Sequence, residues 1–90
     1  MISIQIKESA LKHGITETDI RQVLADPITV RYFAIHEDSF GNPQDMVVGF
    51  TQSGVLVEIG VKYTDDFDIV FHANRVSRRF RALYRREVER

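Results

Sequence analysis

The sequence predicts a small α+β domain built on an antiparallel β-meander of three to four strands, with two helices before the meander and one basic helix after it. Three observations support this fold class. The 90 residues are 43% hydrophobic and 28% charged, which suffices for one core and is too short for two. Apolar residues recur at helical spacing near both ends of the chain and with a period of two in the middle. Short turns separate the segments of period two, so consecutive strands should pair antiparallel within a single domain, residues 1–90.

The N-terminal segment carries two competing signals. Residues 2–6 alternate between apolar and polar side chains, as in a short strand. Residues 7–13 are helix-forming, and Gly14 is a residue type at which helices commonly stop. We therefore predict a first short helix over residues 7–13.

A second helix is predicted over residues 17–25. Thr16 is a favourable N-cap, and Asp19 three residues later completes a weaker form of the capping box. Pro27 prevents the helix from continuing and moves the residue before it out of helical geometry.

Four segments rich in β-branched and aromatic residues follow, over residues 28–35, 46–51, 55–61 and 68–73. Ser53 and Gly54 fit a two-residue hairpin turn between the second and third of these segments. We expect the resulting meander to be covered by all the helices on one face.

From Ser77 onward the chain lacks glycine and proline, and we predict a helix whose two sides differ in chemistry. Its apolar side is formed by Val76, Phe80, Leu83, Tyr84 and Val88. Its opposite side is formed by Arg75, Arg78, Arg79, Arg81, Arg85 and Arg86. The apolar side should pack on the sheet and leave the arginines in solvent.

Charge is segregated along the chain. Residues 1–70 hold five Lys and Arg against eleven Asp and Glu, a net charge of −6, whereas residues 71–90 hold seven Arg against two Glu, a net charge of +5. A solvated helix face explains many such runs. However, like charges three or four residues apart destabilise a helix slightly unless an anion neutralises them, and arginine binds phosphates and carboxylates through two hydrogen bonds. These features favour anion binding, with RNA, DNA or an acidic protein as the partner.

Two segments together resemble the BrnT family, the toxin halves of bacterial type II toxin–antitoxin pairs. The opening Lys12–Ile15, followed by a helix and Asp26–Pro27, is similar to that family's start, and residues 69–84 are similar to its closing strand and arginine-rich helix. Between them, residues 54–58 lie where the family has its middle hairpin. The chain is also similar to a related group of small uncharacterised bacterial proteins that carry His-Ala-x-Arg after the last strand.

The resemblance implies a RelE-like fold, RNA cleavage, inhibition by a cognate antitoxin protein, and contact with operator DNA only through that antitoxin. The sequence also departs from the family pattern. His72, Ala73 and Asn74 stand where the family commonly has Ser-Ala-Arg, so that Arg75 is displaced by one residue. Phe80 replaces an acidic residue that could act as an acid or a base. The resemblance therefore transfers the fold better than the activity.

RNA cleavage without a metal ion requires cations near the phosphate and a titratable group for proton transfer. We assign proton transfer to His72, and we assign catalytic contact with the phosphate to Arg75 and Arg79. The arginines assigned to RNA binding are Arg78, Arg81 and Arg85. The alternative role for His72 is structural, in a half-buried strand position.

The other polar candidates receive structural interpretations. His13, before Gly14, fits a helix C-cap, and His36 should be exposed beside an acidic loop. Glu58 and Lys62 share one face of a strand, and a charge at Glu58 is more commonly on the solvent side than in a cleft. The chain has no cysteine, and its three histidines and its carboxylates lack metal-ligand spacing, so we expect no metal and no cofactor.

The leading hypothesis is a RelE-like endoribonuclease that is the toxin component of a type II toxin–antitoxin system. Its expected partners are RNA and a cognate antitoxin, with no membrane contact, and self-association is left open. The alternative is a non-catalytic module of the same fold that binds nucleic acid or protein through the basic helix. Without an export signal or a long apolar run, the expected location is the cytoplasm.

Overall fold

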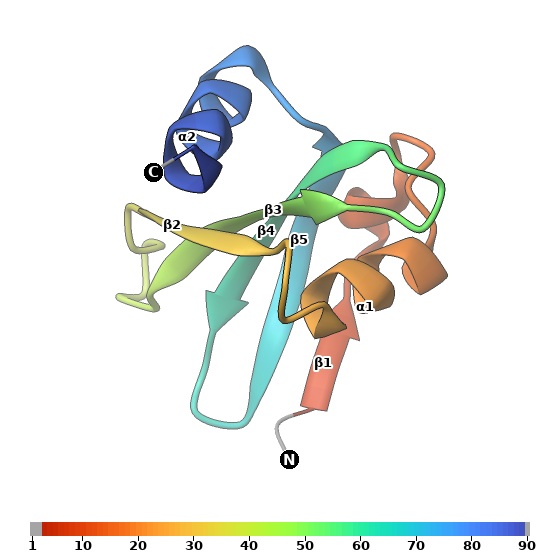
Figure 1. Cartoon of the computed structure of the whole chain (residues 1–90). Coiled ribbons are helices and arrows are strands. Elements are labelled where there is room, and N and C mark those ends of the chain that lie inside the picture. Colours follow the sequence, from red (N-terminus) through yellow and green to blue (C-terminus); the bar gives the residue numbers. More distant parts are fainter. Residues whose placement is uncertain (1–2, 90) are drawn as a thin grey trace.

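The computed structural model describes residues 3–89 and has the predicted α+β class, with a five-stranded mixed sheet in the order β1-β5-β4-β3-β2 (Figure 1). The strands are β1 Ser3–Ile6, β2 Arg31–Ile35, β3 Gln44–Phe50, β4 Leu56–Tyr63 and β5 Phe67–Arg75. The helical elements are the 3₁₀ turn η1 Glu8–Leu11 and the α-helices α1 Glu17–Ala25 and α2 Arg78–Val88. The meander of β2 to β5 confirms four predicted strands, and β1 is an additional strand that makes the sheet mixed.

The N-terminal segment pairs with β5 in parallel, with Ser3 opposite Phe67 and Ile6 opposite Val70. Residue 2, at the start of the alternating segment, lies outside the described residues. The predicted helix over residues 7–13 is wrong, because only η1 forms there. The Lys7 amide donates to the Val70 carbonyl, which keeps the chain in register with β5 up to the start of η1.

The second helix has the predicted bounds. The Thr16 side chain accepts from the Asp19 amide, and the Asp19 carboxylate accepts from the Thr16 amide, so the capping box forms in both directions. Strand β2 begins at Arg31, three residues later than predicted. The Asp26 carboxylate accepts from the amides of Ile28 and Thr29 and holds this segment in a turn.

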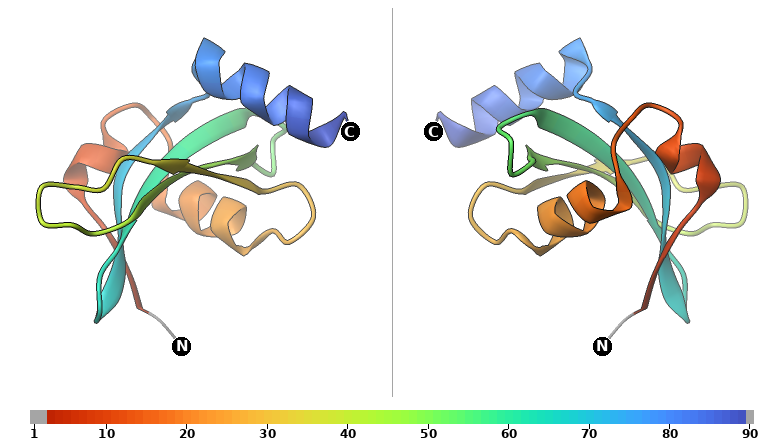
Figure 2. Two further views of the ribbon diagram at one scale, coloured as in Figure 1. Left: turned by 90° about the vertical axis from the view of Figure 1, so that its left-hand side faces the viewer. Right: turned by 90° about the vertical axis from the view of Figure 1, so that its right-hand side faces the viewer.

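The helices lie on opposite faces of the sheet, so the expectation of one covered face is wrong (Figure 2). The core on the α1 face contains Ala10, Ile15, Ile20, Val23, Val47, Val57, Ile59, Val61, Val70 and Ala73. The core on the α2 face contains Met46, Val48, Val76, Phe80 and Tyr84. Successive side chains of a strand point to opposite faces, so β3 and β4 contribute to both cores and have no solvent face.

Helix α2 has the predicted orientation. Phe80 and Tyr84 are buried, Leu83 is half-buried, and the arginines of α2 are exposed. The Tyr84 hydroxyl donates to the Thr29 carbonyl across 2.7 Å, which ties the C-terminal half of α2 to the segment before β2.

The hairpin between β3 and β4 is one residue longer than expected. The Thr51 amide donates to the Val55 carbonyl, which leaves a three-residue loop over 52–54 in place of a two-residue turn. Gly54 has φ +85°, a left-handed conformation that suits glycine at the end of such a loop.

Candidate functional site

A β-bulge in β5 positions His72. Gly60 lies opposite His72 and Val61 lies opposite Val70, so Phe71 is an extra residue without a partner on β4. A Cβ atom at Gly60 would lie 2.7 Å from the Phe71 ring and 3.1 Å from the His72 Cβ, so only glycine fits under this bulge. His72 therefore shares the α2 face with Glu58 and Lys62 of β4.

The Glu58 carboxylate connects His72 to the start of α2. Glu58 Oε2 lies 2.9 Å from His72 Nε2, and Glu58 Oε1 accepts from the amide of Ser77, the N-cap of α2, across 2.6 Å. The Glu58 residue is 6% exposed, whereas the His72 side chain is 31% exposed. An ionised carboxylate only accepts hydrogen bonds, so an ionised Glu58 favours the His72 tautomer with hydrogen on Nε2 and leaves Nδ1 outside this bond.

The expectation that Glu58 lies on the solvent side is wrong. The residue is buried because α2 covers this face of β4 and supplies an amide donor to the carboxylate. The only signal in the sequence was that Glu58 is an isolated charge within the apolar run Val55–Val61. Such a charge is as compatible with a side chain that faces solvent as with one that is buried.

A second histidine lies beside His72. The ring centroids of His13 and His72 are 6.3 Å apart, with an edge-to-face interplanar angle of 60°. His13 is exposed and lies two residues beyond η1, whose C-cap is Lys12, so His13 is not part of a helix and is not a helix C-cap. The fold thus brings together two imidazoles that are 59 residues apart in the sequence, counted from 13 to 72.

The arginines assigned to the site are spread over three places. Arg75 lies two residues after Ala73 on β5 and so points toward the α1 face, where it lines a hollow with His13. Arg78 is exposed in the first turn of α2, directly after Ser77. Arg75 thus shares a hollow with His13, and Arg78 follows the residue whose amide is bonded to Glu58, the partner of His72.

The other assigned arginines lie away from His72. Arg79 lines a hollow with His36, which is exposed as predicted, at the end of β2. Arg81 and Arg85 line a groove with Arg31 between α2 and the start of β2. The N-terminal end of α2 is linked to His72 through the Glu58 carboxylate, whereas Arg79, Arg81 and Arg85 line separate hollows farther along the helix.

Residues 3–89 contain no group of three or more His, Asp or Glu side chains that could together hold a metal ion. None of the helices in this described range is long and apolar enough to cross a membrane. The chain matches no family model, and no curated protein sequence matches it significantly.

Proposed function

We propose that this protein is a metal-independent endoribonuclease that acts as the toxin component of a type II toxin–antitoxin pair. The observation that carries the proposal is the buried Glu58 carboxylate bonded to His72, with His13 beside the same ring and Arg75 in the same hollow as His13. A carboxylate that orients an imidazole and leaves its other nitrogen free is a recurrent arrangement for proton transfer.

In the proposed reaction a ribose 2′-hydroxyl attacks the adjacent phosphorus. His72 Nδ1 takes the hydroxyl proton as the O2′–P bond forms, and protonated His13 gives a proton to O5′ as the P–O5′ bond breaks. The products are a 2′,3′-cyclic phosphate and a 5′-hydroxyl. Arg75 and Arg78 stabilise the negative charge on the phosphoryl oxygens.

The remaining arginines extend the contact with RNA beyond the scissile phosphate. Arg79, Arg81 and Arg85 are exposed on α2 and are free to pair with further phosphates of the same strand. In this proposal an antitoxin inhibits the enzyme by covering the cationic face of α2, and operator DNA is contacted only by the antitoxin. The resemblance of residues 12–27 and 69–84 to BrnT toxins supports this biological role.

A non-catalytic binding module is the second candidate. The observation that favours it is the separation of Arg79, Arg81 and Arg85 from the histidine pair, because these cations need no chemistry at His72 to bind an anion. A neighbouring short reading frame with a DNA-binding half and an acidic or amphipathic half would favour the toxin.

The two candidates are separated by following cleavage of a long RNA in vitro and growth arrest on expression. The parent protein should cut RNA, and His72→Ala should lower the rate by about 10²–10⁴-fold while leaving RNA binding nearly unchanged. The matched control is His36→Ala, an exposed histidine on the same chain that should keep full activity. A parent protein that binds RNA but neither cuts it nor arrests growth would refute the enzyme and support the binding module.

A further inference from the structure

The edge of the sheet at β2 carries an unusual share of exposed apolar surface. Six large apolar side chains are exposed within residues 3–89, and five of them lie on β2 or beside its two ends. These five are Ile28, Tyr32, Phe40, Phe50 and Val88, and the sixth is Leu11 on η1. Ile28 is 79% exposed and Phe40 is 88% exposed. Exposed apolar side chains along one edge of a sheet favour contact with another protein.

At its start, β2 borders a cationic groove. We call it the Arg31 groove, and its lining includes Ile28, Arg31, Phe50, Arg81, Arg85 and Val88, with no carboxylate in the full lining. Its floor includes Tyr84, which is buried against Phe50 with ring centroids 6.0 Å apart. The groove thus combines exposed apolar side chains with three guanidinium groups.

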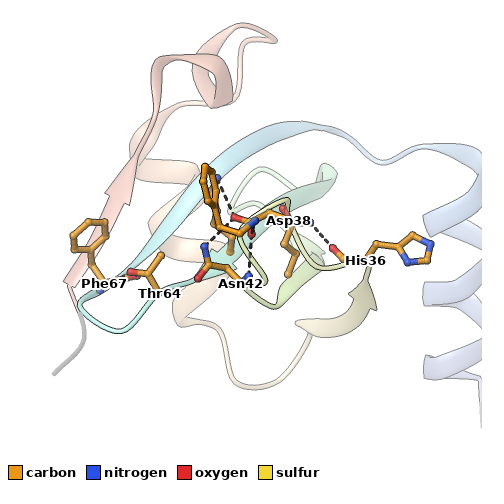
Figure 3. A network of polar contacts seen from close by, with 8 residues as sticks. His36, Asp38, Asn42, Thr64 and Phe67 are labelled. Carbon is orange, nitrogen blue, oxygen red and sulfur yellow. Dashed lines mark hydrogen bonds and ion pairs between the residues drawn. The ribbon is translucent and has the colours of Figure 1, made fainter.

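At its other end, β2 runs into an ordered acidic loop over residues 36–43, which we call the Phe40 loop. The Asp38 carboxylate accepts from the backbone amides of Phe40 and Asn42, each across 2.9 Å, and from the Asn42 side chain across 3.0 Å (Figure 3). It also lies 3.6 Å from Lys62 Nζ. The same hydrogen bonds hold the pKa of the Asp38 carboxyl below its usual range. The loop is therefore fixed in a shape that presents Phe40 and the exposed carboxylate of Glu37 to solvent.

Strand β2 has no neighbour on its outer side among the described residues. The sequence Arg31–Ile35 contains no proline, no bulge is found in its pairing with β3, and its only charge is Arg31 at the first position. Prolines, bulges and several charged side chains are the features by which natural proteins commonly keep a free edge from pairing with another strand. Strand β2 has only the single charge of Arg31, so its unpaired backbone groups are open to another strand.

We propose that a second copy of this chain docks on β2, edge to edge and antiparallel, about a twofold axis centred on Phe33. This register places Arg31 of each copy opposite Ile35 of the other, so that the Phe40 loop of each copy meets the Arg31 groove of the other. Because the interface is isologous, the contact between acidic loop and basic groove occurs twice.

Charge complementarity identifies the occupant as a second copy. The Arg31 groove suits an apolar side chain accompanied by a carboxylate, and the Phe40 loop presents Phe40 together with the exposed carboxylate of Glu37. The two features lie at opposite ends of a five-residue strand, about 17 Å apart, and so cannot meet within one copy. When β2 pairs antiparallel with β2 of a second copy, the end with the loop lies beside the end with the groove. A twofold axis perpendicular to the sheet leaves both α2 helices on the same face, so the dimer joins two cationic faces into one. The dimer does not depend on the proposed nuclease activity.

The test measures the dissociation constant of the full chain by sedimentation equilibrium, with two charge reversals. Arg85→Glu and Glu37→Arg should each weaken self-association by about tenfold, because each replaces two attractive contacts by two repulsive ones. An equimolar mixture of the two variants should restore the parental affinity, because both contacts in the mixed dimer again join opposite charges. Arg78→Glu is the matched control, since Arg78 is exposed on α2 but does not line the groove and should leave self-association unchanged.

Hydrogen exchange locates the contact independently of these variants. Amides of residues 31–35 should gain protection as the protein concentration rises, whereas those of β1, the other edge of the sheet, should not. A protein that stays monomeric at millimolar concentration would overturn the proposal. A dimer that protects β1, or whose affinity the mixed variants fail to restore, would also overturn it.

Discussion

Glu58 and His72 face each other across β4 and β5, and the same carboxylate that holds the imidazole also accepts the Ser77 amide at the start of α2. One buried acidic group therefore fixes both the orientation of the ring and the position of the helix that carries the arginines. Each of its two oxygens takes part in one of these bonds, at 2.9 Å and 2.6 Å. A substitution of Glu58 should therefore change the orientation and the tautomer of His72 more than it changes the affinity for RNA.

The first prediction concerns Glu58→Gln. The glutamine carbonyl can keep the Ser77 bond, but its amide group then donates toward His72 Nε2 and favours the tautomer with hydrogen on Nδ1. RNA cleavage should fall by about 10²–10⁴-fold with RNA affinity unchanged, because the base of the proposed reaction is lost. Nitrogen NMR of the His72 ring should report the changed tautomer, which a role in stability alone would not produce. Full cleavage with an altered tautomer would remove Glu58 from the mechanism.

The second prediction concerns the cationic face of α2. The affinity for single-stranded RNA should fall with salt, with a log–log slope of about −0.7 per phosphate contact, and replacing Arg78 and Arg81 together by alanine should reduce that slope. The control is Arg21→Ala, since Arg21 lies on α1, on the opposite face of the sheet, and is paired with Glu17. An affinity that does not change with salt would leave the arginines as a solvated surface.

The third prediction concerns the packing of α2. Phe80 is 6% exposed, and its ring centroid lies 6.3 Å from that of Phe33. Phe80→Ala should lower the free energy of unfolding by roughly 3–5 kcal/mol, a large share of the stability of a domain of this size. Arg86→Ala, on the exposed side of the same helix, should change it by less than about 0.5 kcal/mol. Equal denaturant midpoints for the two variants would contradict the observed helix orientation.

The fourth prediction concerns pH. Burial raises the pKa of the Asp68 carboxyl on β5, which lines a small hollow with Ile4 and Tyr63. An acid whose pKa is raised on folding favours the folded state below its ordinary titration range, near pH 4, and that contribution is lost as the pH rises through the raised value.

Asp68→Asn should therefore raise the melting temperature at pH 7 by up to about 4 °C, and the difference should shrink as the pH falls through the raised pKa toward about 4. Asp65→Asn, in the exposed turn before β5, is the control for the removal of one negative charge from this part of the chain. A difference that grows toward low pH would mean that the Asp68 charge stabilises the fold.

Local signals predicted the elements that depend on neighbours in the sequence. The capping pair Thr16 and Asp19 and the proline at 27 gave α1 its bounds, and the apolar positions Phe80 and Tyr84 gave α2 its orientation. In each case the determining contacts lie within one helical turn, or the packing face follows from periodicity alone.

Pairing between segments far apart in the sequence could not be predicted from these local patterns. The partner of β1 is β5, more than 60 residues away, so the alternation in residues 3–6 could not be told from a helix start by local patterns. The apolar runs over residues 46–50 in β3 and 56–61 in β4, the second broken by the single charge of Glu58, indicate strands buried on both faces and therefore helices on both sides of the sheet. The burial of Glu58 followed from that second covered face, and so did its contact with His72.

The extra residue Phe71 has a consequence for side-chain phase along β5. Val70 and Ala73 are three residues apart and both belong to the core on the α1 face, whereas an uninterrupted strand would place them on opposite faces. Strand β5 therefore consists of two alternating stretches that are out of phase by one residue, joined at Phe71. Regular pairing that kept Phe71 in the ladder would turn either Val70 or the His72–Arg75 stretch to the wrong face, and the bulge prevents this. The core of this small domain and the orientation of its site histidine thus both depend on the bulge at Phe71, which Gly60 accommodates on the neighbouring strand.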